Sequence, residues 1–184
     1  MKSSITKKQF YTIYHKLDKV SPIDGDCGLL CGASCCKCTD EDMGIYLLPG
    51  EEKLFSRNEE WLHWGWLSAE EYEFPDSWHG KVFFLECRAN GNCPREKRPL
   101  QCRTFPLTPH IDEYGDLYLI YQKGQLPYSC PLISERIPLN RGFIETTYEA
   151  WQTLMQEPLI YDLIMLDSEI RIEDNEDIDI VYPL

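Results

Sequence analysis

Nine cysteines constrain this chain of 184 residues more than any other feature of its sequence. Five of them lie within residues 27–38, three within residues 87–102, and Cys130 stands alone. Thiols at this density form disulfides, carry redox chemistry or bind metals. An odd number of cysteines fits poorly with a closed set of disulfides, and the adjacent Cys35 and Cys36 would pair only in a strained ring.

The N-terminal residues predict the compartment in which these thiols exist. Residues 1–20 carry positive charge but neither the apolar core nor the small-residue cleavage site of a signal peptide. No segment approaches the roughly 18 apolar residues that a membrane span needs. We therefore expect a cytoplasmic protein, in which thiols are kept reduced and metal binding is preferred over disulfides.

Composition limits the other partners of the chain. A hydrophobic content of 43% with 12% aromatic residues is typical of a globular protein, and the length is sufficient for one domain over residues 1–184. The net charge of −13 would repel nucleic acids and anionic membrane surfaces. We therefore expect no nucleic-acid and no membrane partner, and the sequence identifies no protein partner.

The hydrophobic pattern predicts an α+β fold in three parts. Residues 7–19 have apolar side chains at helical spacing, and residues 81–87 read as a strand. Two further β segments flank the turn-like residues 112–116 and predict a hairpin. Helical periodicity predicts two helices over residues 143–170, the second of which begins at Pro158. We expect these helices to brace an irregular, cysteine-rich metal-binding region at residues 27–133.

The first cysteine cluster leaves its own backbone conformation open. Cys27, Cys31 and Cys35 recur every four residues, which would align their sulfurs on one face of a helix. Gly28 and Gly32 oppose a helix at about 1 kcal/mol each, and in a loop they would let the backbone wrap around a metal. In either conformation we expect Cys35 and Cys36 to point in different directions, so that they serve different metals or only one is a ligand.

A local reversal of charge accompanies the second cluster. Residues 87–103 contain five basic side chains and one acid in an otherwise acidic protein. Four thiolates around Zn(II) leave a site charge near −2, and nearby guanidinium groups can donate to the sulfurs and offset it. We expect Arg98 and Arg103, on either side of Cys102, to have this role.

Two motifs together carry a resemblance to a known family. The first is the early run CGLLCGASCC at residues 27–36. The second consists of Cys93, Arg98, Pro99, Cys102, Arg103, Phe105 and Pro106. Over about residues 27–133 the chain resembles the YkgJ-type CxxCxxCC family of zinc- or iron-chelating proteins. It departs from that pattern in two ways: three residues rather than two separate the early cysteines, and Cys38 is additional. The resemblance implies metal binding, but it specifies neither the metal nor a reaction.

The predicted ligands are the eight cysteines that remain when Cys38 is taken as the spare one. They are Cys27, Cys31, Cys35, Cys36, Cys87, Cys93, Cys102 and Cys130. Eight thiolates suffice for two four-coordinate zinc sites, or for one iron–sulfur cluster and one zinc. Their division between sites is open. We weigh the four histidines, His15, His63, His79 and His110, as weaker candidates, with His110 first because it lies near Cys102 in the sequence.

Three classes of function are compatible with these features. The preferred one is a protein whose cysteines hold one or two metal ions, with zinc favoured. The alternative is an iron–sulfur redox or protein-modifying enzyme. The third is an interaction module that uses the acidic tail at residues 173–179, with metal only as scaffold. One branch of the family resembles a flagellin lysine methylase, but no glycine-rich cofactor loop supports methyl transfer here. No catalytic residue is assigned, and whether the chain is an enzyme stays open.

Overall fold

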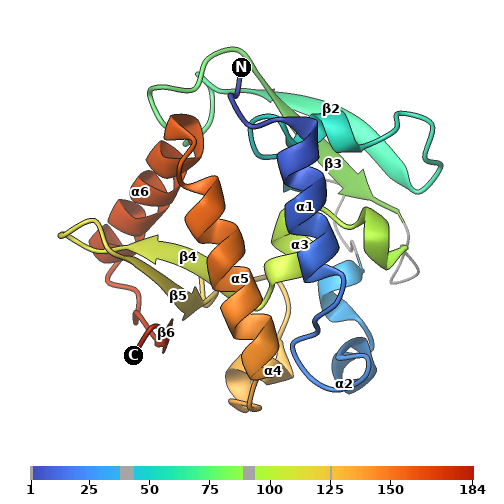
Figure 1. The fold of residues 1–184 in the computed structure, drawn as a ribbon, viewed down its shortest axis with the longest axis vertical. Helices are drawn as coiled ribbons and strands as arrows, with labels where there is room; N and C mark the ends of the chain where they lie inside the picture. Colours follow the sequence, from blue (N-terminus) through green and yellow to red (C-terminus); the bar gives the residue numbers. More distant parts are fainter. Residues whose placement is uncertain (1, 38–43, 89–93, 125) are drawn as a thin grey trace.

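Helices and two antiparallel sheets make up one α+β domain, as predicted (Figure 1). The computed structural model describes residues 2–37, 44–88, 94–124 and 126–184, so Cys38 and the predicted ligand Cys93 lie outside the described residues. The described helices are α1 Lys7–Leu17, α2 Gly28–Cys31, α3 Leu100–Thr104, α4 Pro131–Ser134, α5 Arg141–Leu154 and α6 Pro158–Glu173. The 3-10 turns are η1 Ser34–Cys36, η2 Glu51–Leu54 and η3 Arg95–Lys97. The strands are β1 Ile45–Tyr46, β2 Leu62–Ser68, β3 Lys81–Cys87, β4 Leu107–Ile111, β5 Leu117–Tyr121 and β6 Ile180–Tyr182.

Each sheet has three strands. The first has the order β1-β3-β2, and its register pairs Leu62 with Cys87. The second has the order β4-β5-β6 and pairs Leu107 with Tyr121. The predicted strand at residues 81–87 and the predicted hairpin are thus both confirmed, because alternating apolar residues bounded by turn residues specify strands well.

The sequence of helix α1 explains both where the helix starts and which of its faces is buried. Thr6 caps the N-terminus in a capping box, in which its hydroxyl accepts from the Gln9 amide and Gln9 accepts from the Thr6 amide. The apolar side chains at helical spacing are all buried. They are Phe10, Ile13, Tyr14 and Leu17.

We expect Thr6→Ala to lower the free energy of unfolding by about 1 kcal/mol, since it removes the side-chain oxygen that satisfies a helix N-terminal amide. Denaturant unfolding measures this loss. Thr12→Ala is the matched control, because Thr12 is exposed in the same helix and its hydroxyl donates only to the Lys8 carbonyl within that helix. Equal effects of the two changes would contradict the capping role.

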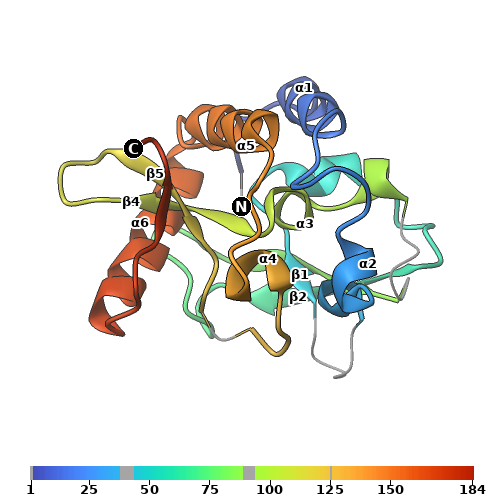
Figure 2. The ribbon, with the colours of Figure 1, turned by 90° about the horizontal axis from the view of Figure 1, so that it is seen from below.

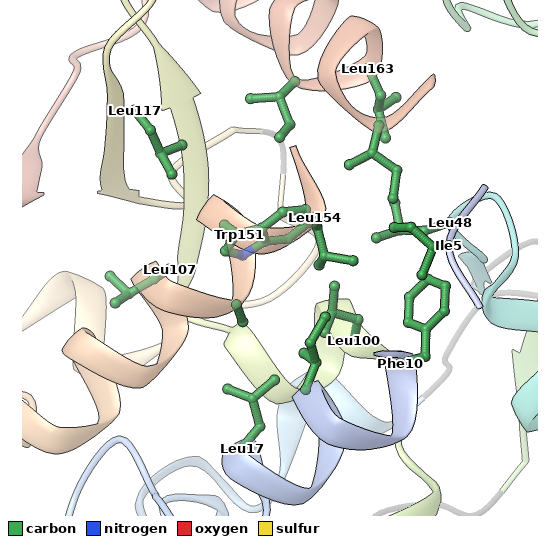
Figure 3. Packing of buried hydrophobic residues seen from close by; sticks show 14 of the residues in the cluster. Ile5, Phe10, Leu17, Leu48, Leu100, Leu107, Leu117, Trp151, Leu154 and Leu163 are labelled. Atoms are coloured by element: carbon green, nitrogen blue, oxygen red, sulfur yellow. The ribbon is translucent and has the colours of Figure 1, made fainter. Parts of the chain in front are cut away.

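The main core lies where α1, α3, α5 and α6 meet the second sheet. Figure 3 shows Phe10 and Leu17 of α1, Leu100 of α3 and Leu154 of α5 pointing into the same space. All five residues of β4 are buried, because α5 and α6 both pack against that strand. Figure 2 shows α1 and α5 side by side on one side of the molecule. The predicted C-terminal helices are present as α5 and α6, and both pack against the second sheet.

The acidic tail does not lie free. The residues directly after it form β6, Ile180–Tyr182, which pairs with β5. The Lys123 ammonium lies 2.7 Å from an Asp177 carboxylate oxygen and 3.0 Å from one of Asp179, and the Arg136 guanidinium lies 2.8 Å from Asp179. Part of the tail's charge is therefore balanced within the chain. Of the described helices, none has the length and apolar character that crossing a membrane requires.

Candidate metal centre

A cavity of about 300 Å³ gathers cysteines from four separate parts of the chain. The segment before α2, the turn η1, the end of β3 and the helix α3 each contribute to its wall. The cysteines on the wall are Cys27, Cys35, Cys36, Cys87 and Cys102. Two of the predicted ligands within the described residues, Cys31 and Cys130, are not on the wall, but both lie near Cys27.

The early cluster is neither one helix nor one loop. Helix α2 makes a single turn and ends at Gly32, which adopts the left-handed conformation (φ +62°) that glycine accommodates without strain. The chain then enters η1 with Cys35 and Cys36. The alignment of Cys27, Cys31 and Cys35 on one helical face is therefore not formed, because Gly32 ends the helix between the second and third cysteine.

The vicinal cysteines lie together rather than apart. The sulfurs of Cys35 and Cys36 are 3.8 Å from each other, and both residues face the cavity. This corrects the expectation that they point in different directions, since the tight turn of η1 brings both side chains to one side. Two ligands of a tetrahedral zinc with Zn–S bonds of about 2.3 Å lie about 3.8 Å apart, so the pair has the spacing of two ligands of one metal.

A second group of thiols surrounds Cys27. Burial, the Asp26 carboxylate and the nearby thiols of Cys130 and Cys31 raise the pKa of Cys27, while the Arg98 guanidinium opposes this rise. Burial also raises the pKa of Cys130. A metal that binds these thiols must displace their protons, so binding to them is favoured as the pH rises. The Arg98 guanidinium therefore lies close enough to Cys27 to affect its pKa, and its role beside metal-bound thiolates stays a prediction.

Tyr128 lies near cysteines of both the early and the later part of the sequence. No sequence motif had identified it as a site residue. Burial raises the pKa of its phenol, and the thiols of four cysteines act in the same direction. These are Cys35, Cys102, Cys130 and Cys36. The ring of Tyr128 packs edge-on against Phe105 at a centroid distance of 6.0 Å. A half-buried phenol that stays protonated is a hydrogen-bond donor, and thiolates are acceptors. The signal in the sequence was its position two residues before Cys130.

Arg103 lies on the cavity wall with its side chain only 3% exposed. Its Nε donates to the Arg98 carbonyl at 2.6 Å, and its Nη1 donates to the Asp18 carboxylate. The guanidinium carbon lies 4.0 Å from the centre of the Tyr14 ring. Its Nη2 is buried and has no hydrogen-bond partner among the described residues. A buried donor left in this state costs about 1–3 kcal/mol.

A buried carboxylate holds α1 and α3 together behind Arg103. Glu51 is 1% exposed and accepts hydrogen bonds from the Tyr14 hydroxyl, the Leu48 amide at 2.9 Å and the Leu100 amide at 2.7 Å. Burial raises the pKa of Glu51, although these donors and Arg103 oppose the rise. The first turn of α3, and with it Cys102, is thus positioned by contacts to η2 and α1.

The sulfurs surround the cavity without closing on a common point. Within the described residues, no three His, Cys, Asp or Glu side chains are grouped closely enough to hold a metal ion. All four histidines are described, and none lines the cavity. His110 is buried in β4, where burial lowers its pKa, so its nearness to Cys102 in the sequence does not bring it to the cavity wall.

Comparisons with protein-family models, with curated proteins and with solved structures gave no match. The resemblance to the YkgJ-type family therefore rests on the two motifs alone and stays a prediction. The structural basis for a function is the geometry of the cavity and of the cysteines around it.

Proposed function

We propose that the chain is a cytosolic metal-binding protein that holds one or two metal ions, with zinc favoured, through cysteine thiolates. The observation that carries the proposal is that cysteines more than 70 residues apart in sequence, Cys27 and Cys102 among them, line one cavity. The ligands would come from the eight predicted cysteines. Soft thiolate ligands suit zinc, and a closed site of four thiolates stabilises a fold.

The charges around the cavity support this proposal. Arg95, Arg98 and Arg103 line the same wall as the thiols, in a protein whose net charge is −13. Positive side chains next to thiolates offset the negative charge that four sulfurs leave around a divalent ion. Tyr128 adds a hydrogen-bond donor on the side of Cys130.

A cysteinyl iron–sulfur centre is the second candidate. The cavity volume of about 300 Å³ is larger than a single metal ion requires and has room for the several atoms of a cluster. The two candidates differ in colour, because iron–sulfur clusters absorb visible light and zinc, a d¹⁰ ion, does not.

Metal analysis of anaerobically purified full-length protein tests the proposal. We expect about one or two equivalents of metal per chain, with a colourless solution if the metal is zinc and visible absorption if a cluster is present. Protein that contains less than about 0.1 equivalent of any transition metal, and takes up none from an added zinc salt, would overturn the proposal. The quadruple variant with serine at Cys27, Cys35, Cys36 and Cys102 is the matched control for adventitious metal.

A further inference from the structure

We propose that Cys35 and Cys36 form a dithiol site for a trivalent organoarsenic compound, whose organic group lies in the adjoining cavity. The ligand class is an arsonous acid, R–As(OH)2, in which arsenic has one bond to carbon and two to exchangeable oxygens. The site uses two of the eight predicted metal ligands but needs no metal, so it goes beyond the metal proposal and does not depend on it.

The two sulfurs are placed to bind the same atom. Their separation in η1 is 3.8 Å. Consecutive Cα atoms are about 3.8 Å apart, which is shorter than the roughly 4.4–6.8 Å usual between disulfide-bonded cysteines. A direct disulfide between Cys35 and Cys36 is therefore strained, whereas an arsenic atom between the sulfurs enlarges the ring. The adjacent thiols thus favour a bridging atom over direct oxidation.

A pair of thiols is what an arsenic atom with one organic group needs. Such an atom forms two further bonds, and thiolate sulfur is a soft ligand that prefers soft acceptors such as As(III). Within the residues that the structure describes, no three His, Cys, Asp or Glu side chains are grouped closely enough to hold a metal ion. A four-coordinate zinc or a three-coordinate inorganic arsenite would have to draw in further side chains, and the organoarsenic compound would not.

The dithiol is accessible and adjoins an apolar space. Cys35 is exposed and Cys36 is half-buried, and both line the cavity of about 300 Å³. Tyr128 lies near both thiols, and its ring packs edge-on against Phe105 at a centroid distance of 6.0 Å. Leu126 continues this apolar wall. Small-molecule sites are mostly apolar with a few convergent polar groups, so the wall suits an organic group carried on arsenic.

The binding step is a condensation that changes no oxidation state. With phenylarsine oxide, the sulfurs of Cys35 and Cys36 each form an As–S bond, and the oxygen leaves arsenic. The two thiol protons leave with that oxygen as one water molecule, so that Ph–As=O and two thiols give Ph–As(SR)2 and H2O. Arsenic stays trivalent, and no oxidant or reductant is needed. After the first As–S bond forms, the second thiol reacts within the same molecule, so the closed adduct resists a competing monothiol.

Phenylarsine oxide added to full-length protein, with and without prior chelator treatment, tests this site. Intact-protein mass spectrometry measures the adduct that survives a titration with 2-mercaptoethanol. We expect one arsenic atom per chain, and at least about a hundredfold more monothiol to remove it from the parent than from Cys35→Ser or Cys36→Ser. Cys31→Ser is the matched control and should behave like the parent, because Cys31 belongs to the same cluster but does not line the cavity.

Peptide mapping and a second ligand locate the organic group. The adduct should lie on Cys35 and Cys36, and the phenyl compound should be retained about tenfold more tightly than methylarsonous acid, because the cavity buries more apolar surface of the larger group. An adduct on Cys27 or Cys130, or equal retention of the two compounds, would overturn the proposal even if the serine variants failed to fold.

The same preparations separate this site from the metal proposal. An adduct on chelator-treated protein that takes up no zinc would support the dithiol site while the metal proposal fails. Protein that binds zinc but forms no adduct after chelator treatment would overturn the dithiol site and leave the metal proposal standing.

Discussion

Replacing Arg103 with glutamate is expected to lower the free energy of unfolding by about 3–5 kcal/mol, the typical cost of breaking a buried ion pair. The new carboxylate would face Asp18 in a position where the side chain is 3% exposed, and the stacking on Tyr14 would be lost. For a chain of this size the loss corresponds to a Tm lower by about 6–20 °C. Thermal and denaturant unfolding both measure it.

The same change is expected to weaken metal retention. A carboxylate about 5 Å from an anionic thiolate site interacts with it by about 3 kcal/mol at an effective dielectric near 20, or about two orders of magnitude in affinity. Arg103→Gln should do less, because it keeps a donor and adds no charge. Arg141→Glu is the control, since Arg141 is 89% exposed on α5 and pairs with Glu145 at the surface. If Arg103→Glu lowers the free energy of unfolding and the metal affinity no more than Arg141→Glu does, the buried pair has no such role.

Cys102→Ser is expected to remove about one equivalent of metal and to lower the Tm by about 5–10 °C. A ligand present at about 100 times its Kd stabilises the native state by about 2.7 kcal/mol, and each kcal/mol shifts the Tm by about 2–4 °C in a domain of this size. Cys102 lies in α3 on the cavity wall, so the loss falls at the centre of the proposed site. Elemental analysis and thermal unfolding are measured on the same preparation.

Cys38→Ser is the matched comparison for Cys102→Ser, because the family motif leaves Cys38 over. We expect it to retain the metal content and the Tm of the parent. Chelator treatment of the parent should lower the Tm at least as far as Cys102→Ser does. Equal metal loss in the two variants would show that Cys38 is a ligand as much as Cys102 is. If the metal-free parent has the same Tm as the untreated protein, the metal does not stabilise the fold.

The local elements of the fold could be predicted from the sequence because each depends on neighbouring residues. The apolar residues of Lys7–Leu17 repeat with the helical period, and Thr6 with Gln9 signals the start of that helix. Alternation and flanking turn residues identify Lys81–Cys87 and the hairpin of β4 and β5. The number of cysteines also predicted a thiol-based metal site, and that part stays a prediction.

The arrangement of the site was decided only by tertiary structure. Because Cys35 and Cys36 are adjacent in the sequence, we expected their side chains to point in different directions. In η1 their sulfurs are instead 3.8 Å from each other. No local pattern pairs Arg103 with Asp18, 85 residues away, or places Tyr128 among four thiols.

The tail shows the same limit, because its partners are distant in the sequence: the Lys123 ammonium lies 2.7 Å from an Asp177 carboxylate oxygen, and β6, directly after the tail, pairs with β5. The physical reason is that helix and turn signals arise from contacts within a few residues. The convergence of distant side chains on one cavity instead depends on how helices and sheets pack, which no short window of sequence contains.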